Sequence, residues 1–272
     1  MHLGATLRLL RVDAGLSLRD LARRIGVSSA YLSRVENGLD AVPTPERLSA
    51  IARELGVPPT LLMDVSHRVN PFLAHYLEQE PGAGALCLDI ARRQLTGAQL
   101  ARVRRFLDEE FPVRAARREE PVPALAPLLV PERMVLRLTC TAVEDALDVA
   151  SGRLAAACPG VSAPRLVAEL TRREAEASNR VGNGVAVPRA YLEHAEPLAA
   201  LVTLARPLRI ETPDDVPLRL LVVLVGGERG REALVRLAHV ARLASHGLAE
   251  RLAEVEHPAQ VFERLAELET LR

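Results

Sequence analysis

Residues 17–38 read SLRDLARRIGVSSAYLSRVENG and predict two short helices joined by a tight turn. Ser17 precedes the first helix and Asp20 follows it by three positions, a capping pair that satisfies free backbone donors at a helix start. Gly26 stands where the chain must stop and reverse, and glycine tolerates the left-handed backbone of such a turn. Ser28 then caps a second helix. The stretch therefore predicts a helical hairpin whose second helix is free to enter a groove of DNA.

The second helix of this hairpin has an inward and an outward face. Leu32 and Val35 point toward a core, and the small Ala22 lies where the two helices must cross. The side chains left outside or at the helix ends are the candidates for DNA contact: Ser28, Ser29, Ala30, Tyr31, Ser33, Arg34 and Asn37. A plain helical bundle is the alternative interpretation, although it has no special need for this combination.

Residues 31–38, YLSRVENG, complete a resemblance to the helix-turn-helix of the Cro and phage-repressor family, the Xre family. The resemblance covers about residues 3–65. That family has five helices, and this chain has five helical patterns in the same order. Besides the hairpin they are an amphipathic stretch, a stretch opened by threonine and proline, and a short last helix: 3–14, 45–55 and 58–65.

The resemblance implies a docking geometry and a role for each candidate residue. The second hairpin helix would lie in the major groove, with the short side chains of Ser29, Ala30 and Ser33 close to base edges. Arg34 would read a guanine or hold a phosphate. The remaining candidates would contact the DNA backbone: Tyr31 and Asn37.

The charge balance bounds how this chain could bind nucleic acid. Its 272 residues include 35 basic and 35 acidic side chains, so no global field draws it toward DNA. Within residues 1–37, six arginines accompany three acids, a local surplus of three. Because this surplus is modest for a DNA-binding module, we expect two copies to act together, as a homodimer on a palindromic double-stranded operator.

Cysteine usage and hydropathy exclude several other classes of protein. Cys87, Cys140 and Cys158 are widely spaced in apolar surroundings, which indicates reduced core thiols and neither a disulfide set nor a zinc site. We expect no metal and no other cofactor. No signal peptide and no apolar run of the ~18 residues that span a membrane is present. We therefore expect a cytoplasmic protein without a membrane partner.

The middle of the chain gives a weaker pattern. Residues 86–107 suggest two helices around a turn at Thr96, and four of the seven aromatic residues lie close by: Phe72, Tyr76, Phe106 and Phe111. We expect these aromatics to form the core of a small helical unit, with a dimer face as the alternative. Residues 114–132 are charged and then proline-rich, which indicates an extended linker. The expected domains are residues 1–67, 68–131 and 132–272.

The third region alternates strand-like and helix-like runs. Two almost wholly apolar runs indicate central strands covered on both faces: 198–204 and 220–225. Two further strands are expected at 135–138 and 184–188. Helices are expected at 141–157, 162–177, 229–244, 247–255 and 258–271. The predicted fold class is multidomain: an all-α helix-turn-helix domain and helical linker, then an α/β sandwich with a mixed sheet flanked by helices.

Residues 181–189, VGNGVAVPR, resemble the active-site signature of the IIA domains of the fructose, mannitol and nitrogen branch of the bacterial sugar phosphotransferase system. In that family the residue after the proline is the histidine that accepts a phosphoryl group, and here it is Arg189. A guanidinium stays protonated and offers no lone pair to phosphorus. A second, assisting histidine is matched by about Ala233, and His194 is the one nearby substitute for the nucleophile. The resemblance therefore implies a domain without a catalytic residue, and we expect no enzyme activity.

Without the acceptor histidine, the remaining groups around the signature are suited to binding an anion. Backbone amides and guanidiniums around a concavity bind anions well, and the candidate residues are Arg173, Gly182, Asn183, Gly184 and Arg189. Two interpretations stay open. In one the domain is kept for dimerisation or for docking another protein, such as a phosphotransfer-system protein. In the other it senses an anionic, phosphorylated metabolite.

The sequence thus predicts a sequence-specific DNA-binding transcriptional regulator with a catalytically inactive IIA-like domain used for sensing, docking or dimerisation. A phosphocarrier related to the phosphotransfer system is one alternative, and Arg189 and Ala233 argue against it. A protein-binding adaptor is the other, mildly disfavoured by the outward Arg34.

Overall fold

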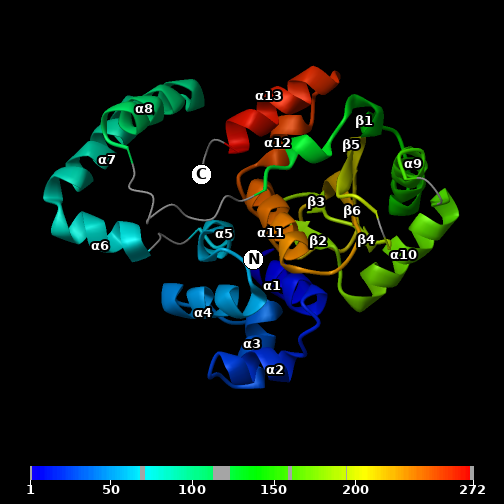
Figure 1. Cartoon of the computed structure of the whole chain (residues 1–272), viewed down its shortest axis with the longest axis horizontal. Helices are drawn as coiled ribbons and strands as arrows, with labels where there is room; N and C mark the ends of the chain where they lie inside the picture. Colours follow the sequence, from blue (N-terminus) through cyan, green and yellow to red (C-terminus); the bar gives the residue numbers. More distant parts are fainter. Residues whose placement is uncertain (1, 68–70, 113–122, 159–160, 194, 270–272) are drawn as a thin grey trace.

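The computed structural model describes residues 2–67, 71–112, 123–158, 161–193 and 195–269 (Figure 1). Residues 2–67 form the N-terminal domain, residues 71–112 a helical arm, and residues 123–269 the C-terminal domain. The N-terminal domain has five helices, as expected: α1 (His2–Asp13), α2 (Leu18–Arg24), α3 (Ser29–Glu36), α4 (Pro45–Leu55) and α5 (Pro59–Val65).

The hairpin of α2 and α3 forms for the reasons its sequence predicts. The Ser17 hydroxyl accepts the Asp20 amide at 3.1 Å, and the Ser28 hydroxyl accepts the Tyr31 amide at 3.1 Å. Gly26 has a φ of 69°, so the turn between the helices uses the left-handed backbone. Leu21, Ala22, Leu32 and Val35 are all buried.

The arm consists of α6 (Pro71–Gln79), α7 (Pro81–Arg93) and α8 (Gly97–Glu110), and it extends away from the rest of the molecule in Figure 1. Neither α7 nor α8 has a buried residue. The side chains of Tyr76, Phe106 and Phe111 are 48%, 56% and 68% exposed. The expectation that these aromatics form a core is therefore wrong, because the helices contact too little of each other to cover them. Phe72 lies among the residues whose side chains are not described.

The C-terminal domain is built on a mixed sheet of six strands. They are β1 (Met134–Leu138), β2 (Arg180–Gly182), β3 (Val185–Ala186), β4 (Arg189–Tyr191), β5 (Leu198–Leu208) and β6 (Leu218–Gly226). The strand order is β1-β5-β6-β3-β2, and β4 also pairs with β6. Pairing is parallel for β1 with β5 and for β6 with β3 and β4, and antiparallel for β5 with β6 and β2 with β3.

Where one strand was expected at 184–188, the chain forms the separate strands β2, β3 and β4. Gly182, Asn183 and Gly184 all have positive φ, of 89°, 51° and 69°, and they turn β2 back antiparallel to β3. Pro188 then separates β3 from β4, since proline cannot donate to a ladder of hydrogen bonds. The turn and the proline together bring Arg189 to the start of β4, next to β6.

Helices cover both faces of the sheet, as the apolar runs indicate. Ala199 and Leu201 of β5 belong to one core cluster, and the alternating Ala200 and Val202 belong to the other. One face is covered by α9 (Val143–Ala155) and α10 (Ala163–Glu176) (Figure 1). The other is covered by α11 (Arg231–Ser245), α12 (Leu248–Leu252) and α13 (Pro258–Glu269).

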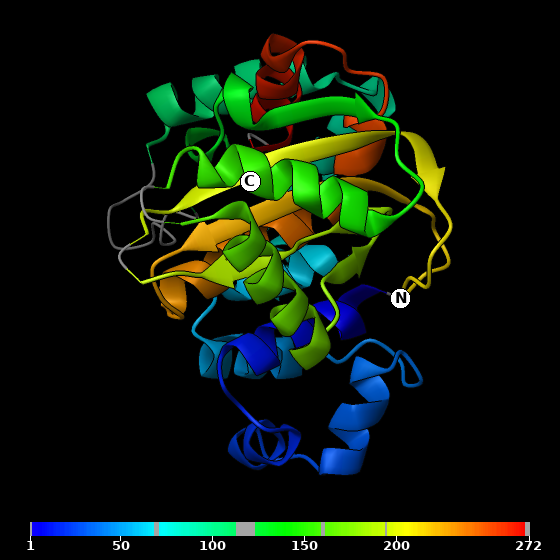
Figure 2. The same ribbon diagram turned by 90° about the vertical axis from the view of Figure 1, so that its right-hand side faces the viewer.

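The N-terminal domain shares a hydrophobic core with the second of these faces. Leu7 and Leu62 of the N-terminal domain lie in the same buried cluster as Leu201 and Leu237 of the C-terminal domain. Helix α1 contacts α11 and β2, and α5 contacts α11. The two domains are therefore packed together, while α2 and α3 project away from the sheet (Figure 2).

Two other expectations are revised by burial. Leu125 and Leu129, expected within an extended linker, are buried in the shared core, and the short turn Ala126–Leu128 packs on α13. Of the three cysteines, all of them free, only Cys158 is buried, and Cys87 is exposed on α7. A search of the described helices finds none that is long and apolar enough to cross a membrane.

Candidate functional site

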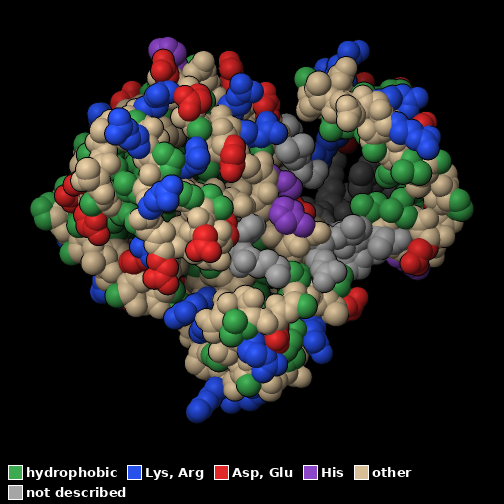
Figure 3. Space-filling view, turned by 180° about the vertical axis from the view of Figure 1, so that it is seen from behind, with side chains coloured by type: hydrophobic (Ala, Val, Ile, Leu, Met, Phe, Trp, Pro, Cys, Tyr) green, Lys and Arg blue, Asp and Glu red, His purple; other side chains and the backbone are tan. Residues whose placement is uncertain are grey.

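The first candidate site is the outward face of α3. The opposite face of α3 carries the buried apolar side chains of Leu32 and Val35, which hold the helix against the N-terminal core. The predicted DNA contacts are all at least partly exposed: Ser28, Ser29, Ala30, Tyr31, Ser33, Arg34 and Asn37. Arginine side chains gather on the lobe that this domain forms in Figure 3. The structure therefore brings the predicted contacts together on one exposed helix.

Besides Ser28, which caps the helix, several of these side chains already have partners within the domain. Arg34 donates from Nε to both carboxylate oxygens of Asp40, at 3.0 and 3.1 Å. Asn37 donates to the Ser33 carbonyl oxygen at 2.8 Å and so caps its own helix. The guanidinium of Arg47 lies 5.0 Å from the centroid of the Tyr31 ring. The ion pair of Arg34 with Asp40 is on the surface, where water screens it and its net contribution is small, so a phosphate can replace Asp40 at low cost.

The second candidate site surrounds Arg189. Its side chain is 1% exposed, and its Nε donates to Asp13 Oδ1 at 2.7 Å. The Tyr191 hydroxyl donates to the other oxygen of the same carboxylate. Asp13 is the last residue of α1 in the N-terminal domain and is itself 3% exposed. A carboxylate from the other domain therefore occupies the position next to the arginine.

Burial and charge fix the protonation of Tyr191. Burial, and after it the Asp13 carboxylate, raises the pKa of Tyr191 far above its ordinary value of 10. The guanidinium of Arg173 lies 4.9 Å from the centroid of the Tyr191 ring. The Tyr191 hydroxyl therefore stays protonated across the physiological pH range, and it donates a hydrogen bond to Asp13.

Three of the five residues expected to hold an anion are bound to other groups of the protein: Arg173, Asn183 and Arg189. Arg173 is paired with Glu169 at 2.8 Å and Glu176 at 3.2 Å. The Asn183 amide donates to Asp214 at 2.6 Å, and its side chain donates to the Ala244 carbonyl oxygen at 3.0 Å. The glycine turn thus faces α11 and the 214 loop, and the two arginines meet instead around Tyr191.

Beside Arg189 only a small cavity is left. It measures about 20 Å³, room for about one water molecule, and Ala233, Arg236 and Gly226 line it with Arg189. The two terminal nitrogens of Arg189 and Nε of Arg236 are buried there without a hydrogen-bond partner. Ala233, which the resemblance matches to the assisting histidine, thus lines the same cavity as Arg189. His194, the candidate substitute nucleophile, lies outside the described residues.

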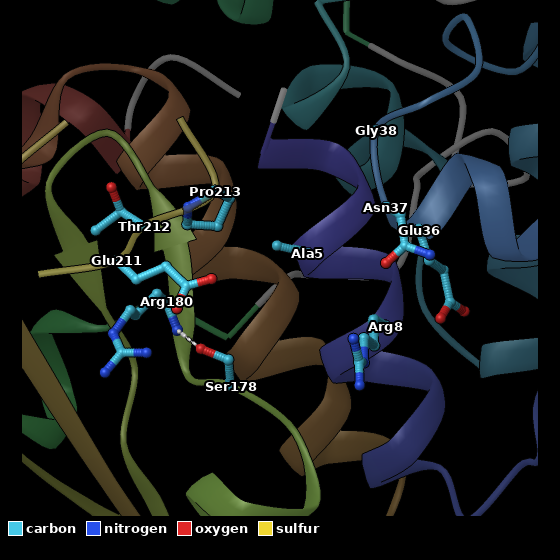
Figure 4. A pocket seen from close by; sticks show the side chains of 10 residues that line it. All are labelled: Ala5, Arg8, Glu36, Asn37, Gly38, Ser178, Arg180, Glu211, Thr212 and Pro213. Carbon is cyan, nitrogen blue, oxygen red and sulfur yellow. Dashed lines mark hydrogen bonds between the residues drawn. The ribbon is translucent and has the colours of Figure 1, made fainter. Parts of the chain in front are cut away.

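A larger hollow lies at the seam between the two domains. This cavity of about 500 Å³ is lined from the N-terminal domain by Arg8 and Asn37, among others, and from the C-terminal domain by Arg180 and Glu211. Figure 4 shows these pairs on opposite walls. Among the described residues, no group of three or more histidine, cysteine or acidic side chains is placed to hold a metal ion. Any molecule in this hollow would contact both domains.

Two residues of the second site were missed by sequence reasoning. Asp13 gives no signal in the sequence, because its partner Arg189 is 176 residues away. Tyr191 follows the signature by two positions, and strand alternation puts it on the same face as Arg189. That spacing was the only available clue.

Comparisons with known proteins divide the chain in the same way. Residues 2–64 match a family model described as a helix-turn-helix domain. Residues 128–268 match the family described as phosphoenolpyruvate-dependent sugar phosphotransferase system, EIIA 2. The second match covers more than half of the chain.

Each individual relative matches one of the two domains. The HTH-type transcriptional repressor RghR of Bacillus subtilis is 42% identical over 55 residues, which are 20% of this chain and 41% of that protein. The nitrogen regulatory protein of Klebsiella oxytoca is 30% identical over 132 residues, 47% of this chain and 81% of that protein. The crystal structure of the nitrogen regulatory protein IIA-Ntr from Neisseria meningitidis has a TM-score of 0.45 at 22% identity, covering 52% of this chain and 97% of that one. The chain thus spans about two-fifths of RghR and most of the nitrogen regulatory protein.

Proposed function

Because the chain belongs to the EIIA 2 family of the phosphoenolpyruvate-dependent sugar phosphotransferase system and carries a helix-turn-helix domain, we propose that it is a sequence-specific DNA-binding transcriptional regulator. Its C-terminal domain, in this proposal, does no phosphoryl transfer and serves the regulator by docking. The observation that carries the proposal is the exposed face of α3, held on a helix-turn-helix domain that resembles those of transcriptional regulators.

The geometry of α3 supports DNA binding over a role in contacting protein. Its outward side chains are short or hydrogen-bonding, and none of the seven candidates is a large aliphatic residue. Protein interfaces are enriched at their core in aromatic residues and arginine, of which the helix offers Tyr31 and Arg34. The other side chains of the face are the small Ser29, Ala30 and Ser33, which suit a close approach to base edges, with Arg34 beside them for a phosphate.

We propose that the DNA-binding form is a homodimer. A single domain of this size buries ~600–1,000 Å² on DNA, which is too little for tight specific binding. Two copies on a dimer would address a palindrome with half-sites one helical turn apart. The exposed apolar side chains of the arm support this form, because Leu86, Leu88, Phe106 and Phe111 are each more than half exposed.

The site around Arg189 supports a domain without phosphoryl transfer. A phosphoryl acceptor needs a neutral lone pair, and the guanidinium of Arg189 is buried and bound to Asp13. The position across from it is Ala233, which carries no titratable group. What the site does bind is a carboxylate of the N-terminal domain, and this supports docking over the sensing of a free anion.

The proposed function is tested by selecting DNA fragments from a random pool with the purified full-length protein, at one stated salt concentration. We expect enrichment of a palindrome with half-sites about 10 base pairs apart. Arg34→Ala should weaken binding to the selected site about tenfold, the loss of one good base or phosphate contact. Arg172→Ala, an exposed arginine on α10, is the matched control and should bind as the wild type.

Two outcomes would contradict the proposal. Folded protein that enriches nothing at low salt would favour the adaptor, whose helix-turn-helix contacts protein. Enrichment of single half-sites by a monomer would keep DNA binding and reject the dimer.

A further inference from the structure

The carboxylate of Asp13 occupies an unfavourable position within its own helix. It ends α1, where the helix dipole concentrates negative charge and favours a basic residue. Its side chain is also 1% exposed, and an isolated buried carboxylate is strongly disfavoured. Among the described residues of the N-terminal domain, no side chain donates to its carboxylate, whereas Arg189 and Tyr191 of β4 both do. The stabilisation of Asp13 therefore comes from the C-terminal domain.

We propose that the arginine in place of the acceptor histidine has turned the former reaction centre into a docking site for the DNA-binding domain. The bound group is the carboxylate of Asp13, held between the Arg189 guanidinium and the Tyr191 hydroxyl. These three residues, the docking triad, set the orientation of the N-terminal domain on the C-terminal domain.

Space around Arg189 supports this reassignment. An arginine is longer than a histidine, and the facing Ala233 leaves the room that the longer side chain needs. Asp13 uses only Nε of Arg189. Its two terminal nitrogens are buried without a hydrogen-bond partner, and Arg189 also lines the remaining cavity of about 20 Å³. A water molecule there would accept at most two of the four N–H groups of these nitrogens.

The triad orients the N-terminal domain without covering its DNA-binding face. Asp13 lies at the end of α1, which packs against the inward face of α3, whereas the hairpin of α2 and α3 projects away from the sheet (Figure 2). Ala30 and Arg34 remain exposed while Asp13 is bound. The docked domain is therefore presented to DNA, and the triad does not inhibit it.

The test uses the full-length protein without DNA, so its outcome does not depend on the proposed function. Thermal unfolding is measured for Asp13→Leu, Arg189→Leu and the double variant. Each single change leaves a buried partner unsatisfied and should lower Tm by about 5–15 °C. The double variant removes both charges and should recover most of that loss, because an apolar pair of similar volume replaces a buried ion pair well.

Amide hydrogen exchange shows which elements lose stability when the triad is weakened. It is measured on a milder variant, in case the leucine variants fold poorly. In Tyr191→Phe, which removes one hydroxyl, amides of α1 and β4 should exchange about tenfold faster than in the wild type. Amides of α9, on the far face of the sheet, should not change. Arg264→Leu, which breaks an exposed ion pair with Glu267 on α13, is the control and should leave both measurements as in the wild type. Additive Tm losses in the double variant, or unchanged exchange in α1, would overturn the proposal.

Discussion

At the scale of single residues, the chemistry of the C-terminal domain depends on position 189. Incubated with phosphoenolpyruvate and the general phosphotransfer proteins, the full-length protein should take up no acid-labile phosphate. The reason is that a guanidinium has no lone pair to offer, and that Asp13 already occupies its Nε. A histidine-bearing IIA domain in the same mixture is the positive control for the assay.

One residue would be examined if label did appear. His194 is five positions beyond Arg189 and is the nearest alternative acceptor in the sequence. Label on the wild type that disappears in His194→Gln would reject the proposal of an inactive domain and revive the phosphocarrier.

Position 189 also shows what a sequence can and cannot predict about this site. The arginine at position 189 was predicted to replace the acceptor histidine from the resemblance of VGNGVAVPR to the family signature, and Ala233, matched approximately to the assisting histidine, lines the same cavity as Arg189. The partner of Arg189 was not predictable. Asp13 lies in another domain, and a single sequence contains no signal for a contact over 176 residues.

At the scale of elements, the contact between α11 and α5 makes stability depend on pH. His246 ends α11 beside Asp64 and His67 of the N-terminal domain, and its ring is 6.5 Å from that of His67. Burial, then the charge of Arg242, lowers the pKa of His246 below its ordinary value of 6.5, although Asp64 opposes this shift. The unfolded chain therefore binds this proton more readily than the folded one.

The sign of the effect follows from this direction. The contribution of His246 is complete above pH 6.5 and is lost as pH falls through 6.5 toward the lower pKa of the folded state. We expect Tm to fall between pH 7.5 and 5.5, and to fall less in His246→Gln. His257→Gln, at an exposed position, is the control and should follow the wild type. An equal decrease in all three proteins would assign the pH dependence to other groups.

Elements were predicted well where periodicity is long and poorly where it is short. The five N-terminal helices and the apolar strands β5 and β6 follow from capping residues and apolar runs. The region around 184–188 was expected to be one strand, and its division into three depends on the consecutive positive φ angles of the GNG turn. Asn183, in the middle of that turn, donates hydrogen bonds to Asp214 and Ala244, which lie far along the chain.

At the scale of the whole molecule, the arm is the part that lacks a partner surface among the described residues. Helix α8 carries Arg102 and Arg104 before Phe106 and Asp108 and Glu110 after it. Two copies of α8 packed antiparallel about Phe106 would place Arg102 of each copy opposite Glu110 of the other, since both lie four residues from Phe106 on the same face of the helix. The charges of the helix thus complement those of a second copy.

Analytical ultracentrifugation tests this arrangement. The wild type should sediment at twice its chain mass of 29.6 kDa, and Phe106→Glu should sediment as a monomer because a charge replaces the apolar centre of the pairing. Val149→Glu, at another exposed apolar position, 36% exposed on α9, is the control and should remain a dimer. A monomeric wild type, or a dimeric Phe106→Glu, would exclude α8 as the dimer contact.

The hydrophobic core that runs from Leu7 and Leu62 into the sheet of the C-terminal domain bears on how such a chain can be re-used. A DNA-binding module joined by a tether can be transplanted onto a foreign effector domain and keep its properties. The N-terminal domain of this protein, moved into a chimaera, would expose the apolar surface that the C-terminal domain now covers. The carboxylate of Asp13 would also lose its hydrogen-bond donors. The specificity of α3 is therefore best moved by grafting its outward residues onto a related scaffold, leaving the domain itself in place.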